Sequence, residues 1–177
     1  FQWFLAGFYG WPDVSHKHKS WTLLRHLSSI VNGPWCCVGD FNAFRHASEK
    51  LSSHPPPVKQ MEDFGTTLED CHLIDLGFQG YKFTWNNKRP GAANTRERLD
   101  RVVANKEWMD YFSASSVYHK FSHASDHMSI ILQTGSDCKF KCRMARGFMF
   151  EERWLLEEDC GRVIEEAWCH VGCVGSP

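Results

Sequence analysis

The chain has 177 residues, which is enough for one domain with its own hydrophobic core and a short additional segment. Hydrophobic residues make up 42% of it, and thirteen Phe with eight Trp exclude an intrinsically disordered chain. The formal net charge of -1 argues against a protein that coats nucleic acid through a generally basic surface. It does not exclude a phosphate-binding site that holds a divalent cation, because the ion brings its own positive charge.

No segment of the sequence predicts a membrane span, and the first residues lack the basic flank and cleavage site of a signal peptide. We therefore expect a nuclear or cytoplasmic protein. The pairs Cys138 with Cys142 and Cys169 with Cys173 lack the two-residue spacing that is common in structural zinc sites. Disulfides are not expected in the compartments named above.

In chain order, the first elements alternate between strand and helix. An aromatic alternation predicts a strand over residues 4–10, and hydrophobic residues at helical spacing predict a helix over residues 21–31. A continuous apolar run over residues 35–39 is typical of a buried strand. Asp40 lies at the exit of that strand.

The middle of the chain is richer in turns. Residues 45–59 are predicted to form a loop, because three consecutive prolines at its end prevent regular structure. Three elements follow, namely an amphipathic helix over residues 61–71 and strands over residues 73–76 and 82–85. Residues 86–94 form a polar loop that we expect to face a substrate.

The pattern of the last third changes once. We predict a strand over residues 98–104, a helix over 106–112, and strands over 117–121 and 128–133 that are joined by a turn at 125–127. Beyond Gly135 a Lys- and Cys-rich linker leads to a helix that carries Trp154 and Trp168. The chain is therefore predicted to divide into a domain at 1–134 and a linker with a helical appendage at 135–177.

The order of these elements predicts the fold class. Strands and helices that alternate without a strict one-to-one order indicate an α/β domain with mixed sheets rather than a doubly wound parallel sheet. Neither of the Gly-rich phosphate loops, G-x-G-x-x-G or G-x-x-x-x-G-K, occurs in the sequence. Dinucleotide binding and P-loop chemistry are therefore excluded.

Three short blocks place polar groups where a predicted strand meets a loop: residues 39–42, 98–101 and 125–127. If they converge, Asp40 could deprotonate or orient a water and Asn42 could hold a phosphate. His127 could donate to a non-bridging phosphate oxygen, with Asp126 or Asp100 fixing its tautomer. These are the parts that phosphodiester hydrolysis requires.

Each block also has a structural reading when it is taken alone. Asp and Asn after a strand are common turn formers. Asp100 between two Arg could form a surface ion pair of little energetic value, and a Ser-Asp-His turn is often only a cap. Three such blocks in one chain favour a site.

The blocks and several further motifs resemble the endonuclease/exonuclease/phosphatase superfamily, which contains DNase I and the apurinic/apyrimidinic endonucleases. They are most similar to the endonuclease domain of plant LINE-type non-LTR retrotransposon polyproteins. The residues that carry this resemblance are 7–12, 34–42, Glu49 with Lys50, 80–87, 97–101 and 125–127, and in the tail Phe148, Phe150, Glu151 and Trp154. The tail motif is similar to the segment that leads toward the reverse transcriptase.

The resemblance implies a DNase I-like four-layer α/β sandwich of two mixed sheets flanked by helices, with Mg2+ as the usual cation and Mn2+ as an alternative. It implies DNA as the partner of the intact domain and a reverse transcriptase in cis. The implied catalytic residues are Asp40 for water activation, Asn42 and Tyr9 for phosphate contact, and His127 as transition-state donor with Asp100 orienting it. Asp126 would belong to the metal-proximal set, and Thr84, Arg101 and Ser125 would bind substrate.

The sequence departs from the family before Tyr9. Family members carry an Asn on their first strand and a metal-binding Glu, both before the position that Tyr9 matches. The residues before Tyr9 in this sequence include neither an Asn nor a Glu. We therefore expect a DNase I-like domain that lacks its first strands. Its function is predicted to be Mg2+-dependent DNA nicking that leaves a 3′-hydroxyl primer, in impaired form. The alternatives are a phosphatase or phosphodiesterase of the same superfamily and a non-catalytic remnant.

Overall fold

The computed structural model describes residues 2–122 and 125–135 together with Asp159, Arg162 and Glu166. The chain divides into two compact units, Phe1–Cys138 and Lys139–Pro177. In the second unit, Arg162 forms ion pairs with Asp159 and Glu166. The linker and most of the helix predicted beyond Gly135, with the motif around Trp154, lie outside the described residues.

A mixed four-stranded sheet forms the centre of the first unit. Its order is β1-β2-β7-β4, with bounds Phe4–Tyr9 for β1, Trp35–Asp40 for β2, Asp100–Ala104 for β7 and Ile74–Asp75 for β4. β1 runs parallel to β2, whereas β7 is antiparallel to both β2 and β4. The predicted α/β class with mixed sheets is confirmed.

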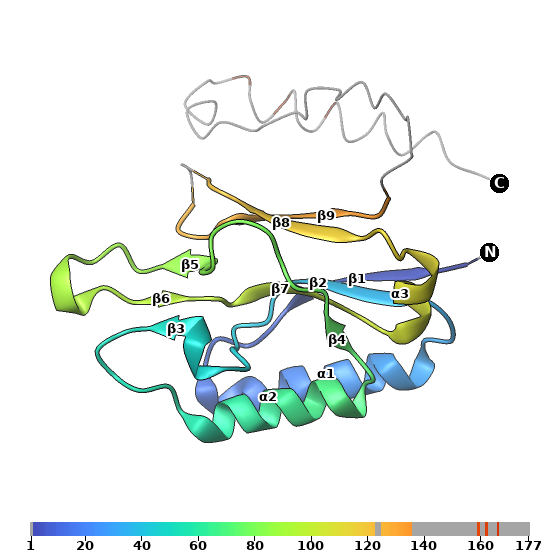
Figure 1. Ribbon diagram of the computed structural model, residues 1–177, viewed down its shortest axis with the longest axis horizontal. Coiled ribbons are helices and arrows are strands. Elements are labelled where there is room, and N and C mark those ends of the chain that lie inside the picture. The colour runs from blue at the N-terminus through green and yellow to red at the C-terminus, as the bar shows by residue number, and fades with distance from the viewer. Residues whose placement is uncertain (1, 123–124, 136–158, 160–161, 163–165, 167–177) are drawn as a thin grey trace. The chain divides into compact units, whose positions relative to one another are not determined.

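Each face of this sheet is covered by other elements (Figure 1). The helices α1 (Lys17–Ile30) and α2 (Val58–Asp70) lie side by side against one face, and the hairpin of β8 (Ser116–Lys120) and β9 (Ser129–Gln133) lies over the other. The short helix α3 (Lys106–Tyr111) follows β7. None of the helices among the described residues is long and apolar enough to cross a membrane.

Strand alternation in β2 and β7 feeds two separate cores. Cys37 and Val103 belong to a buried cluster with Trp21 and Leu24 of α1 and with Phe64 of α2. Their chain neighbours belong to a second cluster beneath β8 and β9, formed by Cys36, Val102, Ala104, Trp108 and Val117. Since both faces are buried, the run over residues 35–39 reads as continuously apolar, which is the pattern from which the strand was predicted.

A second, smaller sheet was only partly predicted. β3 (Lys50–Leu51), β6 (Arg96–Glu97) and β5 (Trp85–Asn86) are two-residue strands in the order β3-β6-β5. The predicted loop over 45–59 therefore contains β3, and the predicted strand over 82–85 is reduced to its last residue. Strands of two residues carry no readable periodicity, so the sequence could not reveal them.

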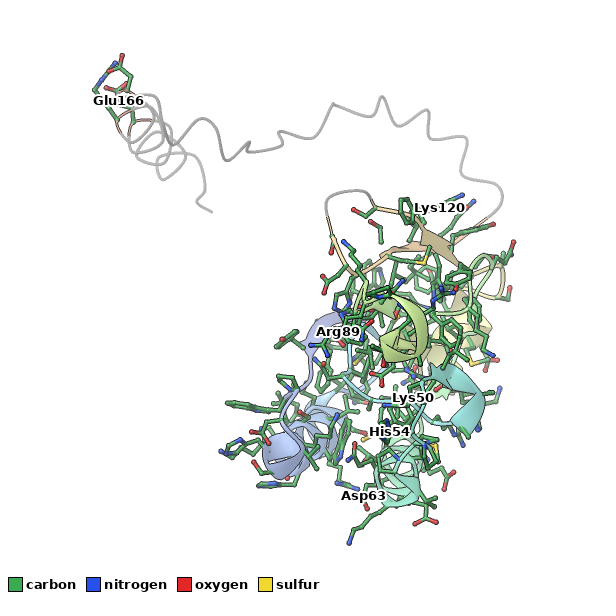
Figure 2. The ribbon with its side chains drawn as sticks, turned by 90° about the vertical axis from the view of Figure 1, so that its left-hand side faces the viewer. Lys50, His54, Asp63, Arg89, Lys120 and Glu166 are labelled. Atoms are coloured by element: carbon green, nitrogen blue, oxygen red, sulfur yellow. The ribbon has the colours of Figure 1, made fainter. Side chains whose placement is uncertain are left out.

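The segment between β3 and α2 descends from Lys50 toward Asp63 in the view of Figure 2. Lys50 of β3, His54 of the connecting loop and Asp63 of α2 mark its course in Figure 2. The Lys50 ammonium pairs with Glu97 Oε1 at 2.5 Å, which ties β3 to β6 beside their backbone pairing.

A buried network of four charges joins β4 and β7 to Glu49, the residue that precedes β3. Arg98 pairs with Glu49 Oε1 at 2.7 Å and with Asp75 Oδ1 at 2.8 Å. Arg101 pairs with the other oxygens of the same two acids, Glu49 Oε2 at 3.1 Å and Asp75 Oδ2 at 3.0 Å. Arg101 also donates to the Ala43 carbonyl at 2.9 Å. Both acids are therefore satisfied by two guanidinium groups in a region that excludes water.

The network lowers the pKa values of both acids. Burial alone would raise the pKa of Glu49, but the charge and hydrogen bonds of Arg101, with help from Arg98, outweigh it and hold the pKa below 4.5. Burial would likewise raise the pKa of Asp75, and the hydrogen bond and charge of Arg98, with Arg101, hold it below 3.8. A depressed folded-state pKa means that these acids stabilise the fold above their unfolded pKa values and lose that contribution as the pH falls through the folded values.

We predict that Glu49→Gln lowers the free energy of unfolding by about 3–5 kcal/mol, because it leaves the buried Arg98 and Arg101 with one carboxylate fewer. The matched control is Glu69→Gln, which removes an exposed pair with Arg45 and should cost less than about 1 kcal/mol. Urea denaturation at neutral pH measures both. Equal, small effects of the two substitutions would contradict the structural role of the network.

Candidate active site

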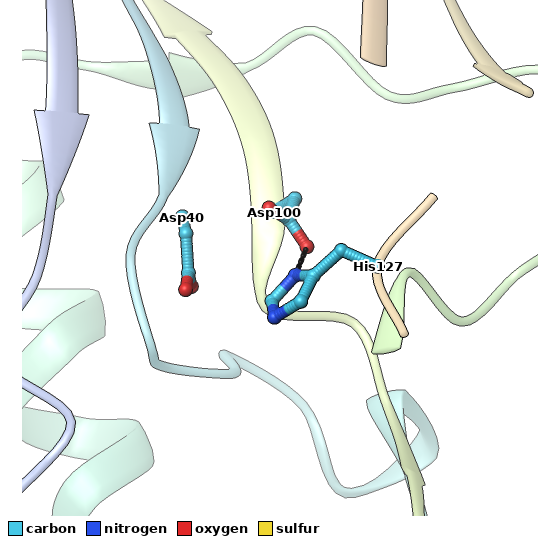
Figure 3. Close-up of side chains that lie close together, drawn as sticks. All are labelled: Asp40, Asp100 and His127. Carbon is cyan, nitrogen blue, oxygen red and sulfur yellow. Dashed lines mark hydrogen bonds and ion pairs between the residues drawn. The ribbon is translucent and has the colours of Figure 1, made fainter. Parts of the chain in front are cut away.

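The three sequence blocks meet at one end of the four-stranded sheet. Asp40 is the last residue of β2 and Asp100 the first of β7, and their Cα atoms are direct partners in the antiparallel register. His127 lies just before β9 and forms an isolated bridge with Trp85. Figure 3 shows Asp40, Asp100 and His127 side by side at this end. The convergence expected from the sequence is therefore present.

Asp100 and His127 form a hydrogen-bonded pair. Asp100 Oδ2 lies 2.8 Å from His127 Nδ1, and the Asp100 residue is only 7% exposed. The backbone N–H of His127 donates to Ser125 Oγ at 3.0 Å, which fixes the turn that carries the ring. The second ring nitrogen points away from Asp100 (Figure 3). Asp100 therefore orients the imidazole and leaves Nε2 for another partner.

Asn42 holds the Asp40 carboxylate on both oxygens. Its backbone N–H donates to Asp40 Oδ1 at 2.7 Å and its side-chain amide to Oδ2 at 2.9 Å. The same amide donates to the Gly10 carbonyl at 2.9 Å, so the turn after β1 and the turn after β2 are linked. Gly39, directly before Asp40, has φ +148, and a Cβ there would lie 2.1 Å from the Phe8 carbonyl oxygen. Only glycine allows β1 to approach this closely.

The surroundings of Asp40 raise the pKa of its carboxyl above 3.8. Burial is the largest cause, and the charge of Asp100 adds to it. The Asn42 backbone hydrogen bond and the charges of His127 and Lys17 act in the opposite direction but do not outweigh burial. A carboxylate whose pKa is raised is a better base than a free one, which suits it to accept a proton from water.

The same groups are the candidate cation ligands. One ligand atom each from Asp40, Asp100 and His127 lies within 4.8 Å of the others. Mg2+ in proteins is commonly held by one or two carboxylates, with water and substrate phosphate completing its coordination. Two carboxylates at one end of the sheet meet that requirement, so the donor set fits a divalent cation of this kind.

Two predicted residues lie next to this cluster. Tyr9 ends β1 directly beside Asp40 in the register, and it is 71% exposed, so its side chain is accessible to a substrate. Asp126 is exposed and accepts a hydrogen bond from the Trp85 indole at 2.9 Å. That hydrogen bond is the main cause of the lowered pKa of Asp126. Asp126 is not one of the three clustered ligand groups, so a role in metal binding remains a prediction.

Thr84 and Arg101, for which substrate contacts were expected, are both 0% exposed in this structure, and those contacts stay predictions. Thr84 Oγ1 accepts hydrogen bonds from the backbone N–H groups of Leu99, at 3.0 Å, and Asp100, at 2.9 Å. The Arg101 guanidinium belongs to the buried charge network. Strand alternation directs Asp100 toward the β8–β9 side of the sheet and Arg101 toward the helices, where it lies over the Phe64 ring.

Two features of the site were not predicted. A cavity of about 160 Å³ opens beside His127, with walls that include the aromatic residues Tyr81, Phe83, Trp85 and Phe121. Lys17 of α1 donates a hydrogen bond to the carbonyl of Asn42. Nothing in the local sequence around Lys17 distinguishes it from the other basic residues of the same helix, so only the folded structure reveals its position.

Comparison with known proteins places the fold. No protein-family model matches the chain, and no curated protein matches it. It is similar to the structure of the 3′-5′ exonuclease NExo from Neisseria meningitidis, at 16% identity and a TM-score of 0.56 over 75% of this chain. The fold is DNase I-like. The predicted resemblance to the endonuclease/exonuclease/phosphatase superfamily is thus confirmed at the level of the fold.

Two further solved structures are similar to the chain. One is the 3′ phosphatase NExo from Neisseria bound to a product DNA hairpin, with 16% identity, a TM-score of 0.52 and 69% of this chain covered. The other is the endonuclease domain of TRAS1, a telomere-specific non-LTR retrotransposon, with 17% identity, a TM-score of 0.48 and 74% of this chain covered. The chain spans 61%, 54% and 56% of the three structures' own lengths, in the order given.

We predict that the carboxyls of Asp40 and Asp126 titrate on opposite sides of the ordinary Asp pKa, Asp40 above it because of burial and Asp126 below it because of the Trp85 indole. Carboxyl 13C NMR titration measures both, with Asp40→Asn and Asp126→Asn as assignment controls. Trp85→Phe should raise the pKa of Asp126 and leave that of Asp40 unchanged. An Asp40 pKa at or below the ordinary value would contradict its desolvation.

Proposed function

We propose that this chain is part of a retrotransposon-type endonuclease that hydrolyses phosphodiester bonds in DNA with Mg2+ or Mn2+. The observation that carries the proposal is the meeting of Asp40 with the Asp100–His127 pair at one end of the central sheet. We further infer that it acts in the nucleus or the cytoplasm and that a reverse transcriptase is attached in the longer polyprotein. The resemblance of the sequence blocks to plant LINE-type endonucleases supports both inferences.

Asp40 would accept the proton of the attacking water. Its two oxygens are held by Asn42, so the carboxylate is already oriented before a substrate arrives. Burial favours its proton-accepting role, as the raised pKa indicates. Both N–H groups of the Asn42 amide are engaged, with Asp40 Oδ2 and with the Gly10 carbonyl. A contact of this amide with the phosphate would require one of these two hydrogen bonds to be released.

His127 would stabilise the charge that develops on the phosphate. Asp100 would accept from Nδ1–H, and the imidazolium form of the ring would donate from Nε2–H to a non-bridging oxygen. Thr84 supports this arrangement, because its hydroxyl accepts a hydrogen bond from the Asp100 backbone N–H and so fixes the start of β7.

Asp40 and Asp100 would hold the divalent cation, which when bound supplies a Lewis acid for the phosphate oxygens. Two carboxylates are a small anionic set for a hard cation. We therefore expect weak cation affinity and slow turnover for this chain.

The test is nicking of supercoiled plasmid by the purified chain. We expect slow nicking that EDTA abolishes, and we expect His127→Ala and Asp40→Asn each to reduce the rate by roughly 10²-fold or more, the effect of losing one preorganised catalytic group. The control is Asp110→Asn, which changes an exposed acid on α3 that pairs with Lys106 and should leave the rate unchanged. Equal rates for parent, His127→Ala and Asp40→Asn would refute the assignment of the site.

A second candidate function is the processing of DNA 3′ ends. It is favoured by the two Neisseria structures, which are described as a 3′-5′ exonuclease and a 3′ phosphatase. An oligonucleotide duplex that carries a 3′ phosphate, incubated beside the plasmid, separates the two activities. If neither the plasmid nor the duplex is cleaved at any divalent cation concentration, a non-catalytic remnant is favoured.

A further inference from the structure

Lys17 holds an ammonium group beside the candidate active site. It is the first residue of α1, and its Nζ donates to the carbonyl of Asn42, the residue that also holds Asp40. The charges of Asp40 and Glu97 are close enough to act on it. Lys17 is thus a cation on the β2 side of the site, whereas His127 approaches from the β9 side.

The two acids near Lys17 and His127 have partners of their own, whereas Lys17 has no carboxylate partner among the described residues. Glu97 is neutralised by Lys50 at 2.5 Å, and Asp100 is hydrogen-bonded to His127. Within the described part of the chain, Lys17 forms no ion pair with any carboxylate, and the Asn42 carbonyl is its hydrogen-bond acceptor. An ammonium has three N–H donors, so two of them are left for another partner.

Holding this cation without a paired anion is unfavourable. Lys17 is half-buried, and burial lowers its pKa in spite of the opposing charges of Glu97 and Asp40. A partly desolvated charge interacts more strongly with an incoming anion than a solvated one, because the effective dielectric constant is lower. An anion bound beside Asp40 would stabilise the Lys17 ammonium and so compensate for the hydration that this group has lost through burial.

We propose that Lys17 binds a non-bridging oxygen of the DNA phosphate that lies against Asp40 and Asn42. The inference rests on the proposed function for the identity of the anion. It assigns a substrate-binding residue that acts without the divalent cation, because the ammonium is part of the protein. The competing structural reading is that Lys17 only caps the Asn42 carbonyl.

Fluorescence anisotropy with a labelled DNA duplex in EDTA tests the proposal, because binding is then separated from cleavage. Lys17→Met should weaken binding by about tenfold through the loss of a charge-assisted contact. It should also reduce the slope of log affinity against log salt by about one phosphate contact. Lys17→Arg should retain most of the affinity and the slope.

The control is Lys106→Met. Lys106 is exposed and pairs with Asp110 on α3. Helix α3 follows the last residue of β7, whereas Asp100 is the first residue of that strand, so Lys106 lies away from the site. This variant should bind DNA like the parent. Thermal melting of all four proteins shows whether any loss of affinity reflects loss of fold.

Two binding results would overturn the proposal. The first is Lys17→Met that binds like the parent and only melts at a lower temperature, since that is the signature of a structural cap. The second is no measurable binding of DNA by the parent at low salt.

Cleavage provides a third result against it: nicking with unchanged KM in Lys17→Met would refute the role of Lys17 and leave the proposed function standing. Lys17-dependent binding without nicking would instead refute the proposed function alone.

Discussion

The antiparallel pairing of β2 with β7 is the constraint on which the site depends. In this register the last residue of one strand is the partner of the first residue of the other, so Asp40 and Asp100 face each other. Both strands alternate between the two cores, and the positions of Asp40 and Asp100 fall on the face that β8 and β9 cover. A shift of the register by one residue would move every side chain of one strand to the opposite face and separate the two carboxylates.

The buried charge network and the active site use neighbouring residues of one motif for different purposes. Arg98 and Arg101 are paired with Glu49, which precedes β3, and with Asp75 of β4, and both Arg lie in the interior. Asp100, between them in sequence, pairs instead with His127 at the end of the sheet. The network stabilises the start of β7 and thereby fixes the position of the Asp100 carboxylate.

The site keeps its carboxylates in a partly desolvated place. Asp40 is close to Asp100, and burial disfavours the charged form of Asp40. The compensating groups are His127, the Asn42 amides and Lys17, which approach from different elements. Such an arrangement is costly for the isolated fold, which is the pattern expected of groups preoriented for a ligand.

The longer elements of the fold were predictable because their periodicity is long enough to read. This holds for β1, β2 and β7 and for the two amphipathic helices, whose buried residues Trp21, Leu24, Phe64 and Leu68 belong to one core cluster. The two-residue strands β3, β5 and β6 were missed or misplaced, because their pairing is decided by contacts between distant segments. The candidate residues Asp40, Asn42, Asp100 and His127 were chosen from their chemistry at strand ends, and the structure brings them together.

The sequence by itself determined the α/β class, the order of the main strands and helices, and the residue types from which a phosphate-cleaving site is built. These depend on local periodicity and on side-chain chemistry, and both follow directly from the order of the residues. Only the tertiary structure decided that Thr84 and Arg101 are buried supports, that Asp126 bonds to Trp85, and that Lys17 reaches Asn42 from another element. The physical reason is that burial, pairing and desolvation depend on which segments lie side by side, and that proximity arises only when the chain has folded.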